Sequence, residues 1–212
     1  MHTLLFATKN PGKQREIKRM MDELSIRVLF PGDLDRAPDI PETGSSFEEN
    51  ARLKAVGYRG LAPEGCIVAA EDSGLVGPAL GGAPGIYSAR YGGLQDDTSR
   101  NALLLKNMAD LHGPERQAYY EAVIVLIDPD GREVSFRGRC TGFIAEKPAG
   151  AGGFGYDPVF FRPDLNRTFA EVDSAAKDAL SHRGEALDRM NRYLEEEIHG
   201  TRDPELQRLP PG

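Results

Sequence analysis

The sequence predicts an α/β protein with a long mixed β-sheet and flanking helices. Apolar strand-like segments alternate with amphipathic helical segments through the first half of the chain, and two long strand-like runs joined by a tight turn come later. Alternation favours parallel strands and a hairpin adds antiparallel ones, so the sheet is expected to be mixed. With 212 residues, the chain is long enough for one sizeable core or two lobes folded together, but short for two independent domains.

The chain begins with a strand, a helix and a second strand. Thr3–Thr8 is apolar and predicts the first strand, and Gln14–Leu24 has apolar residues at helical spacing. Asn10 is suited to cap this helix and Pro11 to be its first residue, because that position needs no backbone N–H. Ile26–Phe30 predicts the second strand.

A second helix follows and leads to a strand with an acidic end. Ser46 is expected to cap the helix, with Glu49 three residues later as its capping-box partner. Cys66–Ala70 predicts a strand that leads directly into Glu71 and Asp72, and then into a glycine-rich turn. Burying a carboxylate is costly unless a cation or hydrogen-bond donors compensate. The two acids therefore suggest a metal or catalytic site at the edge of a sheet, the alternative being the start of a solvated loop.

The second half of the chain predicts a helix and then a hairpin. The helix is expected to start at Asp97 or Thr98 and to extend to Leu111. Strands are expected over Ala118–Ile127 and Glu133–Ile144, because turn residues separate these two runs. The first of the two strands is almost entirely apolar, which predicts burial on both faces.

Two helices are expected near the C-terminus, over Ser174–Leu180 and Ser181–Ile198. Their apolar residues form one predicted stripe, made of Leu180, Leu187, Met190, Leu194 and Ile198. Residues 200–212 are polar and contain prolines, so they are expected to form a frayed, flexible tail.

Composition and charge exclude several classes of function. The chain has 26 Lys and Arg against 33 Asp and Glu, a net charge of −7, which disfavours polymeric nucleic acid and membrane surfaces as partners. No segment approaches the roughly 20 apolar residues of a membrane span, and Met1–Phe6 lacks the pattern of a basic region followed by a long apolar run that is typical of a signal peptide. Cys66 and Cys140 lie far apart without neighbouring metal ligands, so reduced thiols are expected. These features favour a soluble cytoplasmic protein, and the charge still allows a small anionic ligand held by a few local lysines.

Four polar clusters are candidates for the binding of an anionic ligand. Thr8–Lys13 joins a strand to a helix N-terminus, where free N–H groups and Lys13 favour an anion, although helix capping alone also explains it. Glu42 and the helix face with Lys54 form the second cluster, which is otherwise a solvated face. The aromatic residues of Phe154–Asp157 either stack on a planar ring or fold into the core. Lys177 with the His182-Arg183 pair either donates to an anion or carbonyl, or caps the preceding helix.

Taken in chain order, these clusters resemble the motifs of the inosine triphosphate pyrophosphatase family. The matching motifs are Thr8-x-Asn10-x-x-Lys13, Glu42-Thr43-Gly44-x-x-Phe47-x-x-Asn50-Ala51-x-x-Lys54-Ala55, Asp72-Ser73-Gly74-Leu75, the block Leu80–Tyr91 including Ala89-Arg90-Tyr91, Gly153-Phe154-Gly155-Tyr156-Asp157-Pro158 and Lys177-x4-His182-Arg183. The resemblance extends from about Thr3 to Leu194. It implies that residues 1–199 form one two-lobed domain, with the active site in the cleft between the lobes, and that the protein is a homodimer.

The resemblance also implies a reaction, the Mg²⁺-dependent hydrolysis of ITP, dITP and XTP to the monophosphate and pyrophosphate, which removes noncanonical purine nucleotides from the nucleotide pool. Water attacks the α-phosphorus while charge builds on the departing pyrophosphate, so catalysis depends mainly on positioning and charge neutralisation. By motif position, Glu42 and Asp72 are the metal ligands and Asp72 is also the proton acceptor. The positions matching substrate-binding residues are Thr8, Lys9, Asn10, Pro11, Gly12, Lys13, Lys54, Ser73, Phe154, Gly155, Tyr156, Asp157, Lys177, His182 and Arg183.

One departure from the family pattern and two other functions need to be considered. Many members have Asp-Asp where this chain has Glu71-Asp72, and the longer Glu71 side chain would change a direct metal contact into a water-bridged one. A house-cleaning pyrophosphatase for modified pyrimidine nucleotides is the first alternative, which the Phe154–Asp157 block and the His182-Arg183 pair disfavour. A noncatalytic nucleotide sensor is the second, which the presence of both metal-site acids and both phosphate-site lysines disfavours.

Overall fold

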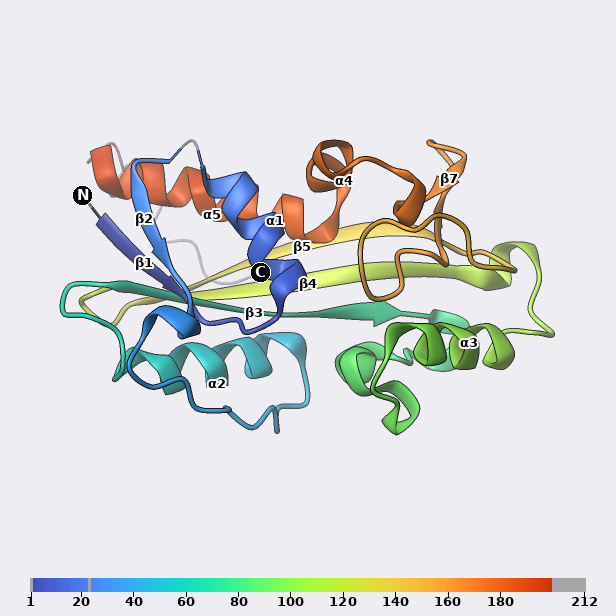
Figure 1. The fold of residues 1–212 in the computed structure, drawn as a ribbon, viewed down its shortest axis with the longest axis horizontal. Helices are drawn as coiled ribbons and strands as arrows, with labels where there is room; N and C mark the ends of the chain where they lie inside the picture. Colours follow the sequence, from blue (N-terminus) through green and yellow to red (C-terminus); the bar gives the residue numbers. More distant parts are fainter. Residues whose placement is uncertain (1, 23, 200–212) are drawn as a thin grey trace, which may run out of the picture.

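The structure is a computed structural model that describes residues 2–22 and 24–199, so the predicted tail at 200–212 lies outside the described residues. A seven-stranded sheet in the order β2-β1-β3-β4-β5-β6-β7 runs along the length of the molecule (Figure 1). The strands are β1 (His2–Phe6), β2 (Ile26–Leu29), β3 (Ile67–Val76), β4 (Gln117–Ile127), β5 (Glu133–Ile144), β6 (Phe160–Arg162) and β7 (Arg167–Thr168). Strands β2, β1 and β3 are parallel, and the remaining pairs are antiparallel. The prediction of a mixed sheet is confirmed.

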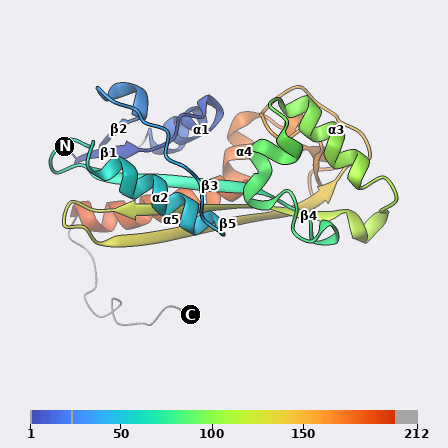
Figure 2. The same cartoon turned by 90° about the horizontal axis from the view of Figure 1, so that it is seen from below.

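Helices cover both faces of this sheet. They are α1 (Pro11–Met21), α2 (Phe47–Arg59), α3 (Asp97–Asn107), α4 (Ser174–Leu180) and α5 (His182–His199). Helices α1 and α5 lie on one face, whereas α2 and α3 lie on the other face, over different ends of the sheet (Figures 1 and 2). One buried cluster joins α1 and α5 to the sheet, a second lies beneath α2, and a third surrounds α3 and β6. The core is therefore divided between the two faces and the two ends of the sheet.

Both predicted helix caps, Asn10 and Ser46, are present, but the reciprocal hydrogen bond expected from Glu49 to Ser46 is replaced by another. Asn10 Oδ1 accepts hydrogen bonds from the N–H groups of Gly12 and Lys13, at 2.8 and 3.1 Å. Ser46 Oγ accepts from Glu49 N at 3.1 Å, as predicted. The predicted capping box is wrong in its second half, because the Glu49 carboxylate turns to Ser45 instead. It accepts from both N and Oγ of Ser45, at 2.6 and 2.8 Å, and so gains two hydrogen bonds.

Strand β3 is longer than predicted. It does not turn after Ala70 but continues to Val76, because β4 pairs with it in antiparallel register from Val68↔Ile127 to Val76↔Tyr119. The expected turn around Gly74 is wrong for a second reason. A Cβ on Gly74 would lie 2.5 Å from Gly85 O, so the missing side chain lets the next segment pack directly on the strand. The two acids therefore lie within a strand and not at its end.

The short strand β1 leaves part of β3 without a neighbour. Their pairing ends at Phe6↔Ala69, so the remainder of this edge of β3 has no strand beside it among the described residues. Side chains alternate across a strand. Ala69 packs with the core beneath α1 and α5, whereas Ala70 packs with the core beneath α2. Glu71 and Asp72 consequently point to opposite faces of the sheet, beside its open edge.

Other sequence predictions meet with mixed results. The strands at Ala118–Ile127 and Glu133–Ile144 are confirmed, and β4 is buried on both faces as expected. Helix α3 ends at Asn107, short of the predicted Leu111, because the chain turns before a Gly-Pro pair. Leu187, Met190 and Leu194 are buried, and the side chain of Ile198 lies outside the described residues. Leu180 is 37% exposed because it ends α4, which the extended residue Ser181 separates from α5, so including it in the stripe was wrong.

Two further expectations concern cysteines and membranes. Cys66 and Cys140 are both buried and free, as predicted. In the part of the chain that the structure describes, every helix is too short or too polar to cross a membrane.

Candidate active site

A cavity of about 330 Å³ opens at the unpaired edge of β3. It collects most of the residues predicted for the site from segments far apart in the sequence. The predicted residues that line it are Thr8, Lys9, Asn10, Lys13, Glu42, Lys54, Asp72, Ser73, Phe154, Gly155, Tyr156, Asp157, Lys177, His182 and Arg183. Pro11 and Gly12 lie beside it in the first turn of α1 and are absent from its lining.

On the α2 side of β3, one lysine joins two carboxylates. Lys54 Nζ donates to Glu42 Oε1 at 2.7 Å and to Asp72 Oδ1 at 3.2 Å. Burial raises the pKa of Asp72 above its ordinary value, although Lys54 and Lys13 act in the opposite direction. Burial alone would lower the pKa of Lys54, but Asp72 and Glu42 outweigh it and the pKa is raised. Asp72 is thus a more basic carboxylate than usual, held beside a charged ammonium group.

Asn50 fixes the orientation of Asp72, a role that the sequence analysis missed. It is fully buried on α2, where its Nδ2 donates to Asp72 Oδ2 at 3.1 Å and its Oδ1 accepts from Gly44 N at 2.8 Å. Asn50 lies four residues before Lys54, so both side chains leave the same helix face. That spacing was visible in the sequence, but only the strand opposite it reveals what the amide contacts.

On the α1 and α5 side of β3, Glu71 holds an arginine. Its fully buried carboxylate accepts from Arg183 Nε at 2.7 Å and from Nη2 at 2.9 Å, a bidentate pair. Lys13 Nζ lies 3.3 Å from the same carboxylate, and Arg183 also donates to Ser73 Oγ at 3.1 Å. Despite complete burial, Arg183 and Lys13 keep the pKa of Glu71 well below its usual range. Glu71 thus supports the cations on this face of β3, although it lines the same cavity as Asp72.

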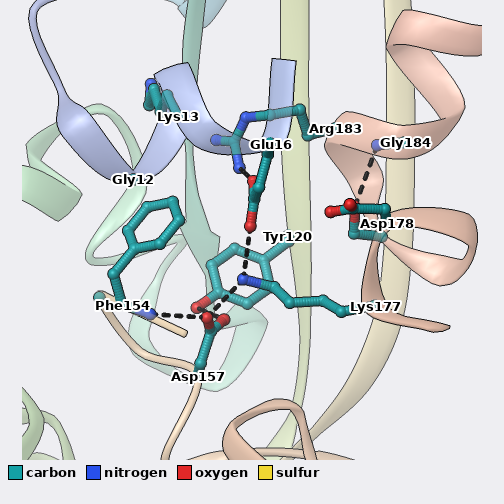
Figure 3. Close-up of polar contacts among 12 residues, drawn as sticks. Gly12, Lys13, Glu16, Tyr120, Phe154, Asp157, Lys177, Asp178, Arg183 and Gly184 are labelled. Atoms are coloured by element: carbon teal, nitrogen blue, oxygen red, sulfur yellow. Dashed lines mark hydrogen bonds and ion pairs between the residues drawn. The ribbon is translucent and has the colours of Figure 1, made fainter. Parts of the chain in front are cut away.

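Glu16 extends this network and was also missed by the sequence analysis. It accepts from Lys177 Nζ at 2.9 Å and from Arg183, and Lys177 in turn donates to Asp157 (Figure 3). Arg183 and Lys177 lower the pKa of Glu16 against the effect of burial. Glu16 lies three residues after Lys13 on α1, on the side of the helix that faces α4 and α5.

His182 is a buried, neutral imidazole. Burial and the neighbouring Arg183 lower its pKa well below the ordinary value, and its Nδ1 has no hydrogen-bond partner among the described residues. The ring stacks on Tyr120, with centroids 4.5 Å apart and planes 8° from parallel. Tyr120 also lines the cavity, although the sequence analysis did not select it. Nδ1 is itself buried, so the imidazole reaches the cavity through the remainder of its ring.

The loop with Phe154 and Tyr156 places its two aromatic rings differently. The ring of Phe154 lies over Lys177 Nζ at 4.7 Å and against Gly12, where a Cβ would approach it to 2.7 Å (Figure 3). Tyr156 turns into the core and donates its hydroxyl to Ser88 O at 2.8 Å. Of the two alternatives for this loop, stacking on a ligand suits Phe154 and inward folding holds for Tyr156.

Two further contacts tie this loop down. Asp157 Oδ2 accepts from Phe154 N at 2.9 Å, and Gly155 N donates to Asp97 Oδ2 at 2.7 Å, which links the loop to α3.

The predicted residues that follow β1 make contacts of their own. Lys9 pairs with Asp39 at 2.7 Å in an exposed position. Thr8 Oγ1 accepts from Asn10 N at 3.3 Å, within the loop that leaves β1.

Fold and site together define a class, an α/β protein with a cleft at the open edge of its sheet, next to a helix N-terminus, that is lined by both acidic and basic side chains. The chain belongs to the Ham1 family, whose model matches residues 4–193. It is 48% identical over 185 residues to a dITP/XTP pyrophosphatase of Thermus thermophilus, covering 87% of each chain, and 43% identical to that of Exiguobacterium sibiricum, covering 90% of this chain and 96% of the relative. The resemblance found in the sequence is confirmed.

Solved structures give the same result. The HAM1 protein of Coxiella burnetii superposes with a TM-score of 0.81 at 37% identity, covering 92% of this chain and 100% of the other. The Ham1 protein of Staphylococcus aureus gives 0.81 at 36% identity, with coverage of 92% and 99%.

Proposed function

We propose that this chain is a nucleoside triphosphate pyrophosphatase that hydrolyses ITP, dITP and XTP to the monophosphate and pyrophosphate. Relatives that are 37–48% identical to it are named dITP/XTP pyrophosphatases. The observation that carries the proposal is the pairing of Asp72 with Lys54 in the same cavity as His182 and Arg183. Asp72 and Lys54 have the chemistry to act on a phosphate, and Arg183 has donors that suit a purine carbonyl.

In the proposed reaction, water attacks the α-phosphorus and passes its proton to Asp72. The bond between the α-phosphorus and the bridging oxygen breaks, and pyrophosphate leaves with the bonding electrons. Asn50 and Lys54 hold the two oxygens of Asp72, so the carboxylate is positioned before substrate binds. The raised pKa of Asp72 favours proton acceptance, because a more basic carboxylate gives more driving force. Lys13 and Lys54 supply positive charge for the phosphates.

We propose Mg²⁺ as the cofactor, with Glu42 and Asp72 as its ligands. The residues fit, because Lys54 already places one positive charge between oxygens of both carboxylates, and Mg²⁺ needs only one or two carboxylates beside water and phosphate oxygens. When bound, Mg²⁺ would neutralise phosphate charge and acidify the attacking water. Both oxygens of Glu71 are engaged by Arg183 on the opposite face of β3, so Glu71 is left out of this ligand set.

Base selection would come from the α5 side of the cavity. Hypoxanthine and xanthine carry a 6-keto acceptor where adenine carries a 6-amino donor. Arg183 donates only, so a 6-amino group placed against it would leave two donors facing each other in a buried site. Such a mismatch discriminates by orders of magnitude. Phe154 offers the ring on which the base would stack.

We also propose that the protein is a homodimer, as the family resemblance implies. Tyr87 is exposed beside a second hollow of about 440 Å³, which the start of α2, the loop at Gly81–Tyr87 and Arg137 of β5 line together. An exposed aromatic ring at such a hollow is typical of a contact surface. Light scattering on the purified protein should give twice the mass of one chain, and Tyr87→Glu should give the mass of a single chain. A monomeric wild type would contradict the dimer.

Measurement of pyrophosphate release tests the proposed reaction. The purified protein is incubated with Mg²⁺ and, in parallel, ITP, XTP, dITP, GTP, ATP and dTTP. Strong release from the first three, with little from the others and none in EDTA, is expected. Release mainly from dTTP would indicate the pyrimidine alternative. Binding of ITP without any release would indicate the sensor.

A further inference from the structure

Arg90 follows Ser88 and Ala89 of the cavity lining and pairs with Glu42, a further lining residue, but it has no role in the reaction described above. It lies at a kink within the segment η3 (Gly85–Gly93), where the backbone departs from 3-10 geometry, and its guanidinium Nη1 donates to Glu42 Oε2 at 3.1 Å. The guanidinium also lies over the ring of Tyr87, 5.2 Å from its centroid. Among the described residues, Glu42 is the one carboxylate that pairs with Arg90.

Arg90 differs from the other cations of the site in how it is held. Arg183 and Lys177 are fixed between buried acids, with side chains 3% and 6% exposed. The Arg90 side chain is 41% exposed, and Glu42 is also partly exposed. An ion pair in such a position is weak and is readily exchanged for another partner. Arg90 can therefore change partners where Arg183 cannot.

The partner that Arg90 shares explains when it would move. Glu42 divides its two oxygens between Lys54 and Arg90, and Lys54 connects it to Asp72. Arg90 is thus one carboxylate away from the lysine that faces the reacting acid. When a ligand in the cavity displaces Glu42 from Arg90, the guanidinium loses its ion-pair partner and is free to bind phosphate oxygens nearby.

The chemistry of the leaving group matches a guanidinium at this position. Pyrophosphate gains negative charge as the bond to the α-phosphorus breaks, and each of its phosphates offers several oxygens. A guanidinium binds two such oxygens at once through its planar fork, whereas an ammonium acts as a point charge. Lys13, Lys54 and Arg90 each face a carboxylate in the free protein, and Arg90 has the most exposed side chain of the three. Once it leaves Glu42, Arg90 adds a further cation on this side for the charge of the leaving group.

We infer that Arg90 is a binding residue for the pyrophosphate leaving group, and that Glu42 holds it in readiness in the free protein. The inference rests on the proposed function, since it assigns a contact to the product of that reaction. Arg90 contacts the departing phosphates directly and adds its charge to that of the lysine and arginine groups deeper in the cleft.

Removing the side chain tests this role with a matched control. Arg90→Ala should lower kcat for ITP by about 10²-fold, the usual cost of losing one preorganised donor to developing charge. Arg90→Lys should recover part of the loss, because it keeps the charge without the fork. Arg52→Ala is the control. Arg52 is a similarly exposed arginine on α2 that is absent from the cavity lining and pairs with Glu133 of β5 at 2.7 Å, so the kcat of this variant should stay within about twofold of the wild type.

A second readout separates a direct contact from mere support of Glu42. Calorimetric titration of pyrophosphate in EDTA measures binding without turnover or metal. Direct contact predicts that Arg90→Ala weakens this binding about tenfold or more relative to Arg52→Ala. Equal pyrophosphate affinity of the two variants would overturn the inference. If Arg90→Ala does not fold, the same comparison is made with Arg90→Lys, for which unchanged affinity and unchanged kcat would overturn it.

The two proposals fail in different ways. A wild type that releases no pyrophosphate from ITP contradicts the proposed function, whereas an active wild type with an equally active Arg90→Ala contradicts only the role of Arg90.

Discussion

The two faces of strand β3 carry charge networks of opposite character, although their central acids are adjacent in sequence. On the α5 side, the Glu71 side chain is fully buried and Arg183 and Lys13 surround its carboxylate. On the α2 side, side-chain exposure rises from 9% at Asp72 through 14% at Lys54 and 27% at Glu42 to 41% at Arg90. The first network has every partner fixed, whereas the second is open to exchange. One strand therefore separates groups that must stay in place from groups that must react.

The largest expected effect comes from the open network. Asp72→Asn removes the proton acceptor while keeping the hydrogen bond to Asn50, so turnover of ITP should fall about 10³-fold or more. Binding of ITP should persist, since the base side and the lysines are intact. Single-turnover kinetics and calorimetric titration measure the two quantities separately. A variant that keeps a substantial fraction of kcat would remove Asp72 from its assigned role.

Stability should respond to a different extent on the two faces. Glu71→Gln leaves Glu16 as the one acid that pairs with the buried Arg183 among the described residues, and Lys177 shares that acid, so the loss should be about 3 kcal/mol of unfolding free energy. Glu42→Gln breaks a partly exposed pair and should cost about 1 kcal/mol or less. Urea denaturation of both variants at neutral pH measures the difference. Equal losses of unfolding free energy would mean that the two networks contribute equally to stability, which contradicts the comparison.

The pH dependence of activity sharpens the role of Asn50. Asn50→Asp places a second carboxyl group against Asp72, and like charges raise the pKa of a carboxyl group that burial has already raised. Asp72 must be ionised to accept a proton, so the acidic limb of the kcat/KM profile should move upward by about one pH unit. Asn50→Ala lacks the added charge and serves as the control. If the acidic limb of the kcat/KM profile of Asn50→Asp stays where it is in Asn50→Ala, residue 50 does not affect the pKa of Asp72.

The smallest effect concerns His182 and stability in mild acid. Its pKa is lowered in the folded protein, so below the unfolded value of about 6.5 the unfolded chain binds a proton that the folded chain does not. Stability is therefore lost as pH falls below about 6.5. Between about pH 7 and 5.5 the wild type should lose about 1 kcal/mol more than His182→Gln does. Parallel curves for the two proteins would show that His182 titrates normally.

Much of this molecule could be predicted from the sequence because its signals are local. The caps at Asn10 and Ser46, the hairpin between β4 and β5 and the apolar face of α5 each depend on residues within a few positions of one another. Most of the predicted binding residues also line one cavity, since motifs of a known family led to them, whereas Pro11 and Gly12 lie beside it.

The remainder depends on contacts between distant segments. The sequence suggested a turn after Ala70, but pairing with β4 carries the strand onward and the pleat then separates Glu71 from Asp72. Glu16, Asn50 and Tyr120 acquire their roles from partners on other elements, 22 residues away for Asn50 and as many as 167 for Glu16. Local sequence patterns cannot predict partners that are so distant in the chain. The open edge of β3 arises from the short length of β1, which only the register reveals.

The most direct test shortens the acid on one face of β3 by one methylene group and, in a second variant, lengthens the acid on the other face by one. Glu71→Asp and Asp72→Glu are both conservative, and pyrophosphate release from ITP is measured for each beside the wild type. The separation of the two faces predicts that Asp72→Glu loses about 10²-fold or more in kcat, because the reacting carboxylate is displaced. Glu71→Asp should stay within about tenfold, because its carboxylate acts only through Arg183 and Lys13. Equal losses, or a larger loss in Glu71→Asp, would contradict the assignment of the reaction to Asp72.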